Sequence, residues 1–205
     1  MNIILDMGSG NGNGNDPDYI KASIDAIADI DTGRHKVYLK YQLFTNAPPN
    51  KPFSEKAFNY AYKYGKAKGY QVTASVFDSF STKILLQYDI PFVKIANRPD
   101  LYYYMYYMGG EKVIVSYTGN KPASRDTDCT YLACISEYPA TVEQYEDKFS
   151  PFNLRDGISD HTVGFDLFNK HQPFWWEKHF VLERTDDNPD AGPFAVMPDD
   201  LRGVL

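Results

Sequence analysis

The amino-acid sequence predicts a compact (β/α)8 barrel, the TIM-barrel class, with several shortened helices. Eight short runs rich in β-branched and aromatic residues recur along the 205-residue chain, helix-like segments alternate with them, and nearly every run ends in polar side chains. Strands that alternate with helices pair in parallel through right-handed crossovers. Eight such units match a barrel at the short end of its size range, and a doubly wound open sheet is the main alternative.

The strands and the two clearest helices follow from local patterns. A helix is predicted over 17–33, where Asp16 and a proline begin it and Gly33 ends it. A second is predicted over 54–70, with apolar residues along one side and Gly69 as its stop. In chain order the strand-like runs are NIILDM, KVYLKYQ, YQVTASVF, PFVKIAN, KVIVSYT, TYLACIS, RDGISDH and PFWWEKHF.

Several connections are too short for full helices. Few residues separate PFVKIAN from KVIVSYT, and the segment TVEQYEDKFSPFNL has room for only one or two helical turns. The tyrosine-rich segment 101–110, LYYYMYYMGG, predicts a short helix that covers the sheet with amphipathic rings. Stacking of a base or a sugar on these rings is the alternative.

Composition indicates one globular domain over residues 1–205. The net charge of −6 argues against a general nucleic-acid binder, although local lysines remain available for a small anion. The chain has no apolar run long enough to cross a membrane and does not open with a secretory leader pattern. We therefore expect a cytoplasmic protein in which Cys129 and Cys134 are reduced, with no nucleic-acid or membrane partner.

Polar residues gather at the carboxyl ends of the predicted strands, which in a barrel converge on one face. Lys40 and Lys94 stand inside apolar runs, where an ammonium group is costly unless it meets an anion. With several hydroxyl groups they indicate a phosphate or carboxylate site, although each lysine taken alone is better explained as a snorkelling or edge-strand residue. The strand-end set comprises Asp6, Lys40, Gln42, Ser75, Lys94, Asn97, Ser116, Ser136, Tyr138, Ser159, His161, Glu177, Lys178 and His179.

Two histidines end neighbouring predicted strands. His161 and His179 lack the helical spacing of a metal motif, so only barrel closure brings their imidazoles together. Two imidazoles with open positions suit a divalent cation such as Mn²⁺ better than a closed zinc site. In SDH, strand alternation points Ser159 and His161 to the same side and Asp160 away, toward structural hydrogen bonds rather than a hydrolase triad.

The glycine-rich segment 8–18, GSGNGNGNDPD, follows the first strand. It lacks the Lys-Ser/Thr pair of a P-loop, and its glycines do not fit a GxGxxG frame. A loose connection is therefore the favoured interpretation, and backbone binding of phosphate is the alternative. His35 and His171 lie in loop-like contexts and are given no role.

The segments CISEYPA, GISDHTVG, WWEKHFVLER and NPDAGPFAVMPDDL resemble, in this order, landmarks of the sialic acid synthase family of PEP-dependent enzymes. Upstream, YLKYQLF, VTASVFD, FVKIAN and VIVSYTG extend the resemblance over nearly the whole chain. The resemblance implies a (β/α)8 barrel that condenses phosphoenolpyruvate (PEP) with an N-acetylated amino sugar in its aldehyde form. The products would be a sialic-acid-like nonulosonic acid and phosphate.

The same resemblance implies roles for individual residues. His161 and His179 match the two histidines that hold the divalent metal, Mn²⁺ or Mg²⁺, and Asp6 stands where the family usually has a glutamate of the catalytic face. Sugar-binding positions match Gln42, Tyr138 and Asp190, the last in an NPD segment. The PEP-binding positions match Lys40, Ser75, Lys94, Ser116, Ser136 and Ser159.

The chain departs from the family pattern at several places. After Lys94 it reads KIANRPD, so Asn97 replaces a serine and Pro99 replaces the sugar-binding glutamate. We also expect no C-terminal antifreeze-like domain after residue 205, and a homodimer is a further expectation. Two alternatives stay open: a PEP-dependent synthase with a different aldehyde acceptor, and a degenerate barrel that binds a sugar phosphate without turnover.

Overall fold

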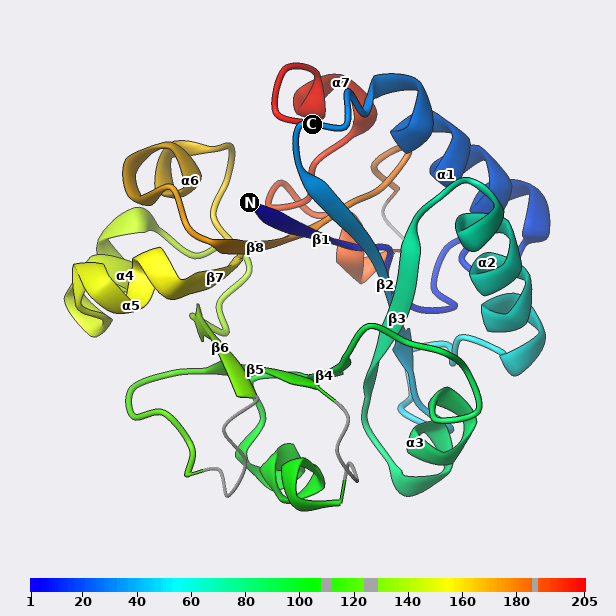
Figure 1. The fold of residues 1–205 in the computed structure, drawn as a ribbon, viewed down its shortest axis with the longest axis horizontal. Coiled ribbons are helices and arrows are strands. Elements are labelled where there is room, and N and C mark those ends of the chain that lie inside the picture. The colour runs from blue at the N-terminus through cyan, green and yellow to red at the C-terminus, as the bar shows by residue number, and fades with distance from the viewer. Residues whose placement is uncertain (108–111, 124–128, 186–187) are drawn as a thin grey trace.

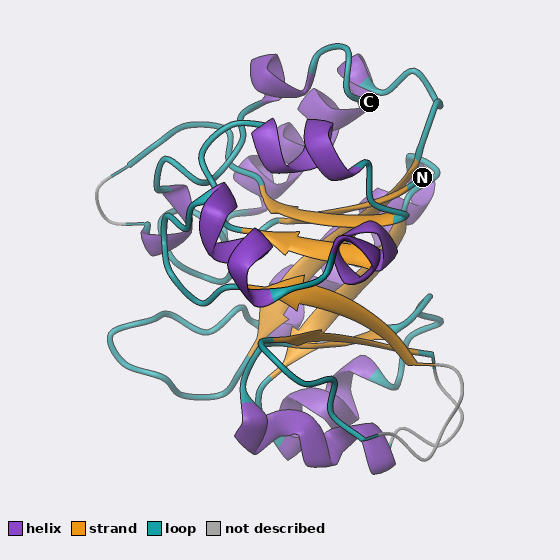
Figure 2. Ribbon diagram, turned by 90° about the vertical axis from the view of Figure 1, so that its left-hand side faces the viewer, coloured by secondary structure: helices purple, strands orange, loops and turns teal. Residues whose placement is uncertain are grey.

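The computed structural model describes residues 1–107, 112–123, 129–185 and 188–205. Its eight parallel strands close into a barrel in chain order, with helices packed around the outside (Figures 1 and 2). The predicted fold class is therefore confirmed, and the open-sheet alternative is wrong. The strands are β1 (Asn2–Asp6), β2 (Lys36–Leu43), β3 (Gln71–Val76), β4 (Val93–Ile95), β5 (Val113–Tyr117), β6 (Cys129–Cys134), β7 (Gly157–Asp160) and β8 (Trp175–His179).

The helices are long on one side of the barrel and short on the other. The Asp16 side chain caps the first helix by accepting from the Asp18 amide, and Ser54 caps the second in the same way. The described helices are α1 (Pro17–Ile30), α2 (Glu55–Ala67), α3 (Ser79–Leu85), α4 (Val142–Lys148), α5 (Pro151–Asp156), α6 (Asp166–His171) and α7 (Pro198–Leu201), with 3-10 turns η1 (Pro99–Tyr106) and η2 (Pro189–Ala191). Shortened helical elements are thus present after β4 and β6, as predicted, but the connection after β6 holds two short helices, α4 and α5, rather than one or two turns.

The tyrosine-rich segment forms η1 over part of its length. Leu101, Tyr104 and Met105 are buried in the layer outside the barrel, whereas Tyr103 and Tyr107 are exposed. Its last residues, 108–110, lie outside the described part of the chain. The prediction of a short helix that covers the sheet therefore holds for the described residues.

Strand register places the ends of distant segments side by side. β1 lies between β2 and β8, so Asp6 pairs in register with Lys40 on one side and with His179 on the other. Ser75 at the end of β3 is the register partner of Lys94 on β4. Barrel closure thus brings side chains from the first and last strands to one face.

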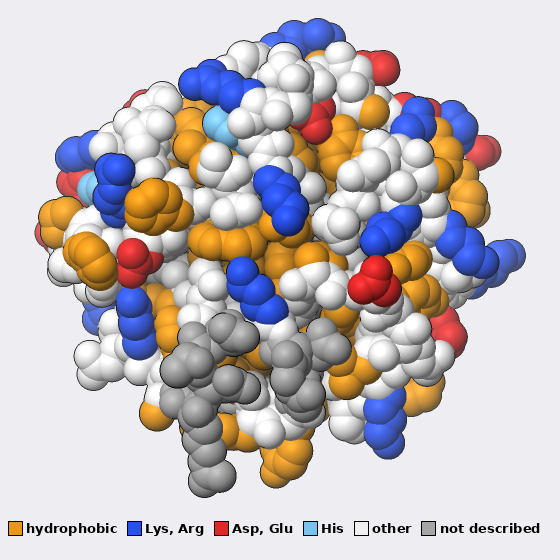
Figure 3. Space-filling model, in the orientation of Figure 1, with side chains coloured by type: hydrophobic (Ala, Val, Ile, Leu, Met, Phe, Trp, Pro, Cys, Tyr) orange, Lys and Arg blue, Asp and Glu red, His pale blue; other side chains and the backbone are white. Residues whose placement is uncertain are grey.

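The amino-terminal end of the barrel is closed by its own side chains. Tyr38 and Phe92 lie with ring centroids 5.2 Å apart, and Trp175 packs against both. The Lys36 ammonium lies 5.2 Å from the Tyr38 ring centroid, and Lys112 lies 4.9 Å from that of Trp175. Figure 3 shows basic side chains over hydrophobic ones near the middle of one face of the molecule. Because this end is packed, the barrel opens at the opposite end.

The larger core lies between the strands and the surrounding helices. From α1, Ile20, Ile24 and Ile27 face the sheet at the i, i+4, i+7 spacing of an amphipathic helix. Each such fully buried side chain contributes about 1.5–3 kcal/mol by leaving water. None of the described helices has the length and hydropathy required to cross a membrane.

We expect Phe92→Ala to destabilise the fold by about 3–5 kcal/mol, because it leaves a cavity inside the closed end of the barrel. Phe152→Ala, at a side chain that is 71% exposed, is the matched control and should change stability by less than about 0.5 kcal/mol. Urea denaturation measures both values. Equal effects of the two substitutions would contradict the packed barrel end.

Candidate active site

One cavity of ≈ 820 Å³ opens at the carboxyl ends of the strands. This is the face on which barrel enzymes place their catalytic groups. All of the residues predicted from the sequence line this cavity: Asp6, Lys40, Gln42, Ser75, Lys94, Ser116, Ser136, Tyr138, Ser159, His161, His179 and Asp190. Barrel closure therefore assembles the whole predicted set in one place.

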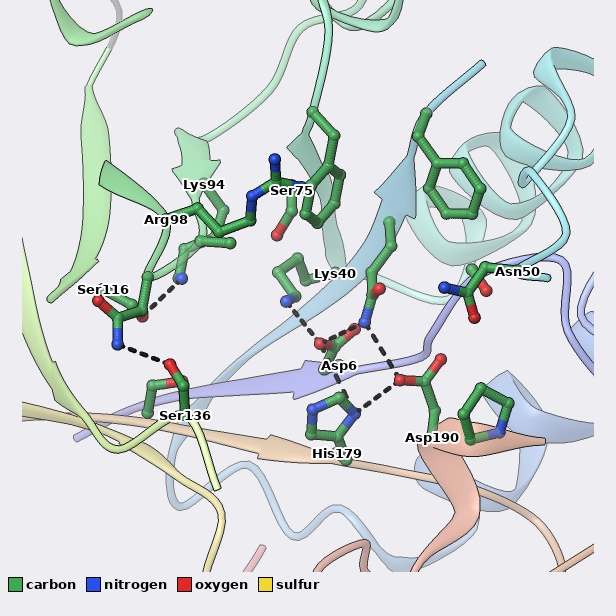
Figure 4. A pocket seen from close by; sticks show the side chains of 18 of the residues that line it. Asp6, Lys40, Asn50, Ser75, Lys94, Arg98, Ser116, Ser136, His179 and Asp190 are labelled. Carbon is green, nitrogen blue, oxygen red and sulfur yellow. Dashed lines mark hydrogen bonds and ion pairs between the residues drawn. The ribbon is translucent and has the colours of Figure 1, made fainter. Parts of the chain in front are cut away.

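The floor of the cavity is a chain of buried charges. The Lys40 Nζ atom lies 2.6 Å from Asp6 Oδ2 and 2.9 Å from Glu177 Oε1. The other carboxylate oxygen of Glu177 lies 3.2 Å from Lys94 Nζ, which also donates to the Ser116 hydroxyl at 2.8 Å. Figure 4 shows Asp6 and Lys40 facing each other in the centre of the site, with Lys94 and Ser116 to one side. Two lysines and two carboxylates thus alternate across four strands.

These buried carboxylates and lysines are ionised because each lies beside an opposite charge, which offsets the cost of removing it from water. Burial is the largest single influence and would raise the pKa of Asp6 and of Glu177, but the neighbouring charges together outweigh it, and both pKa values lie below the ordinary range. Lys40 acts on both carboxylates, and Lys94 adds to its effect on Glu177. Burial opposes the charge of Lys40 as well, yet the two carboxylates hold its pKa above the usual value. Lys94 has one carboxylate partner, and burial lowers its pKa. Lys94 is therefore the less fully compensated lysine.

Hydroxyl and amide groups surround the lysines. Ser75, Ser116 and Ser159 are buried at the ends of β3, β5 and β7. Asn97, which follows β4, donates from Nδ2 to the Ser136 hydroxyl at 2.8 Å. This half of the cavity presents ammonium groups together with directional donors, the combination that suits an oxyanion.

Beyond the lysines lie the two imidazoles and two aromatic rings. The His161 Nδ1 atom lies 2.6 Å from the Ile135 carbonyl oxygen. A carbonyl only accepts, so Nδ1 carries the proton and Nε2 keeps its lone pair. Burial lowers the pKa of His161 to about 3, so its ring is neutral. Tyr138 stacks on His161 at 4.1 Å between centroids, and Phe194 meets the His179 ring at 5.2 Å.

His179 carries an unsatisfied buried atom. Its Nδ1 has no hydrogen-bond partner among the described residues, and the nearest oxygens belong to Asp190 at 3.4 Å and Asp6 at 3.8 Å. The Gln42 Nε2 atom donates hydrogen bonds to both carboxylates, at 3.0 Å to Asp6 and 3.5 Å to Asp190. Burial raises the pKa of Asp190. Asp190, in η2, therefore lies on the histidine side of the cavity.

The residues fit a divalent metal as a pair of imidazole ligands. The His161 and His179 ring centroids lie 5.6 Å apart, and the His179 Nδ1 atom has no hydrogen-bond partner among the described residues. The His161 Nδ1 atom is bound to the Ile135 carbonyl, which leaves Nε2 of that ring as its metal-binding nitrogen. Over the described ranges, no group of three or more His, Cys, Asp or Glu side chains is arranged to hold an ion. The other ligands of a bound ion would be water or substrate.

Asp160 points out of the cavity, as strand alternation predicts. Its carboxylate accepts from Trp176 Nε1 at 3.0 Å and from the Thr162 amide at 2.8 Å. It also pairs with the Lys178 ammonium at 3.2 Å, and both side chains are 0% exposed. This cluster fixes β7 against β8, so Asp160 supports the site without entering it.

Glu177 has a role that its position at a strand end does not predict. Its carboxylate joins the two buried lysines, Lys40 and Lys94. Alternation along β8 carries the signal, because Glu177 lies two residues before His179 and faces the same side. The other two histidines lie outside the cavity. His35 precedes β2, as the loop-like context predicts. His171 does not lie in a loop but ends α6, where it contacts Glu146 at 3.0 Å.

The interpretation of the glycine-rich segment as a loose connection is wrong. A Cβ atom on Gly10 would lie 2.2 Å from the Pro52 carbonyl oxygen, so only glycine permits this contact. Asn15 binds the Pro52 carbonyl and the Ser54 amide, while Asn11 binds the Lys51 amide at 2.9 Å. The segment is therefore packed against the β2–α2 connection and forms one wall of the cavity.

A closed barrel with lysines, hydroxyls and paired imidazoles at the carboxyl ends of its strands is typical of barrel active sites. The chain belongs to the NeuB family, whose model matches residues 29–205. No curated protein sequence matched the chain.

Solved structures with the same fold include three of interest. The N-acetylneuraminic acid (sialic acid) synthetase of Leptospira borgpetersenii, in complex with citrate, is 21% identical with a TM-score of 0.74, covering 98% of this chain and 80% of its own. A spore coat polysaccharide biosynthesis protein of Bacillus subtilis is 20% identical, also with a TM-score of 0.74, over 98% and 65%. The DAHP synthase of Thermotoga maritima is 12% identical with a TM-score of 0.66, over 100% and 67%.

We expect Asp160→Ala to destabilise the fold by about 3–5 kcal/mol, because it leaves the Lys178 ammonium buried without a carboxylate. Asp147→Ala, on the exposed side of α4, is the control and should be close to neutral. Thermal and urea unfolding give the two values. A neutral Asp160→Ala would show that the cluster does not hold β7 against β8.

The buried His161 ring predicts acid sensitivity. Its folded pKa of about 3 lies below the usual value of about 6.5, so the unfolded chain takes up a proton that the folded chain does not. Stability should therefore fall as the pH drops from about 6.5 toward 3, and His161→Asn should flatten that slope. Urea unfolding at several pH values measures it. An unchanged slope would mean that other groups carry the effect.

Proposed function

We propose that this protein condenses PEP with an N-acetylated amino sugar in its open aldehyde form, giving a sialic-acid-like nonulosonic acid and phosphate. The observation that carries the proposal is the cavity floor, where two buried lysines lie among strand-end hydroxyls and beside two imidazoles. Membership of the NeuB family supports the same class of reaction.

PEP would occupy the lysine side of the cavity. Lys40 and Lys94 supply positive charge, and strand-end hydroxyls supply donors for the phosphate and carboxylate oxygens. The contributing serines are Ser75, Ser116, Ser136 and Ser159. Because the lysines are already fixed by Asp6 and Glu177, little side-chain reorganisation accompanies binding.

The aldehyde would lie on the histidine side, against Gln42, Tyr138 and Asp190. His161 and His179 would hold Mn²⁺ or Mg²⁺, and such an ion supplies Lewis-acid polarisation of a carbonyl. The Ile135 carbonyl keeps the His161 ring in one tautomer, with Nε2 available as a ligand.

The reaction balances without a redox partner. Carbon 3 of PEP forms a bond to the aldehyde carbon, whose oxygen becomes a hydroxyl by gaining a proton. Water adds at carbon 2 and loses a proton. The carbon–oxygen bond to phosphate then breaks while the new hydroxyl gives its proton to the departing phosphate, which leaves a 2-keto acid. Asp6 is ionised and lies between Lys40 and His179, so we assign it the proton released by that water.

A second acceptor class is favoured by one local feature. Pro99 begins η1, so the chain presents no carboxylate at the position where the family resemblance places a sugar-binding glutamate. An aldehyde other than an N-acetylhexosamine is therefore the alternative substrate. The PEP side of the site is the same in both cases.

Phosphate release from PEP, measured with Mn²⁺ and a panel of aldehydes that includes N-acetylhexosamines, tests the proposal. We expect release with an N-acetylhexosamine and a loss of at least about 100-fold in His161→Ala. His171→Ala, outside the cavity, is the matched control and should retain activity. Release with other aldehydes alone would select the alternative acceptor, and a protein that binds neither PEP nor metal in calorimetry would exclude both.

A further inference from the structure

The charges on the cavity floor are balanced within the protein. Asp6 and Glu177 match Lys40 and Lys94 one for one, within 2.6 to 3.2 Å. Asp190 adds a further carboxylate on the histidine side. A substrate with a phosphate and a carboxylate therefore enters a site whose lysines are already compensated. A cation that is not already paired with a buried carboxylate would strengthen the binding of such a substrate.

Arg98 is placed to supply that cation. It follows β4 by three residues and lines the cavity, and Figure 4 shows it on the same side as Lys94 and Ser75, across from Asp190. Its Nε and Nη2 atoms donate to Asp100 at 3.1 and 2.5 Å. The side chains of this pair are 55% and 60% exposed. A pair so exposed is weak because solvent screens it, so a bound oxyanion can displace Asp100.

Lys178 and Asp78, which also line the cavity, are held by other groups of the protein. Lys178 is buried and paired with Asp160. Asp78 caps α3 and accepts from the Thr45 and Ser81 amides at 2.8 and 2.7 Å, so its carboxylate is fixed as well. Among the cavity-lining cations that the structure describes, Arg98 alone is paired only with an exposed carboxylate.

We propose that Arg98 is a substrate-binding residue that exchanges Asp100 for an oxyanion of PEP, with Asp100 acting as its competitor in the empty site. The proposal rests on the proposed function, because it names a further contact for the same substrate. A guanidinium binds a phosphate or carboxylate through two parallel N–H donors. The exchange replaces an exposed pair with one nearer the cavity floor, where solvent screens it less.

Calorimetric titration of the full chain with PEP, without an acceptor, tests this contact apart from turnover. Arg98→Gln should raise the dissociation constant about 10- to 100-fold and make binding less sensitive to salt. Arg98→Lys should restore part of the affinity. Asp100→Asn should tighten binding by up to about fivefold, because it removes the competitor. Arg202→Gln is the matched control, since Arg202 forms an exposed pair with Asp199 outside the cavity lining.

The outcomes separate the two proposals. If PEP binds equally to the wild type and Arg98→Gln, the role of Arg98 is wrong while the proposed function stands. If PEP binding depends on Arg98 but no aldehyde releases phosphate, Arg98 is a PEP ligand and the proposed reaction is wrong. Failure of the wild type to bind PEP, or an equal loss in Arg202→Gln, overturns the Arg98 proposal.

Discussion

The structure depends on one chain of buried charges, Asp6, Lys40, Glu177 and Lys94, held inside a closed barrel. An isolated charge in such a place costs several kcal/mol even after relaxation, so each of these groups requires its neighbours. The neighbours come from β1, β2, β8 and β4, which no short segment of the sequence contains. The two lysines can therefore be buried at the base of the site only because the barrel closes between β1 and β8.

Much of the fold is arranged to support that constraint. The aromatic rings at the amino-terminal end exclude water from below, which lowers the local dielectric and strengthens the pairs above. Asp160 and Lys178 fix β7 against β8 from outside, so that Ser159, Glu177 and His179 keep their places on the inner face. The glycine-rich segment closes one wall by packing against the β2–α2 connection.

The sequence predicts the strands and the inward residues because both follow from local alternation. Lys40 and Lys94 stand out since each interrupts an apolar run, and SDH gives Ser159 and His161 one face. The role of Glu177 does not follow from local sequence because it depends on Lys40 and Lys94. These two residues are distant in the chain, and only barrel closure brings them to Glu177. The packing of the glycine-rich segment is not predictable for the same reason. Its partners, residues 51–54, belong to a different connection of the barrel.

The cavity has two chemically different halves, and the division follows from strand order. Lys94 and the serines come from β3 to β7 or from the residues that follow these strands, and Arg98 follows β4, whereas β1, β2 and η2 contribute Asp6, Gln42 and Asp190. Lys40, also on β2, lies between the two halves, where it contacts Asp6 and Glu177. An oxyanion is repelled by the second half, and neutral hydroxyl groups find acceptors there. In the proposed condensation of PEP with a sugar aldehyde, this asymmetry would orient the two substrates. The imidazoles of His161 and His179 would lie beside the aldehyde, and the reacting carbons would meet where the two halves join.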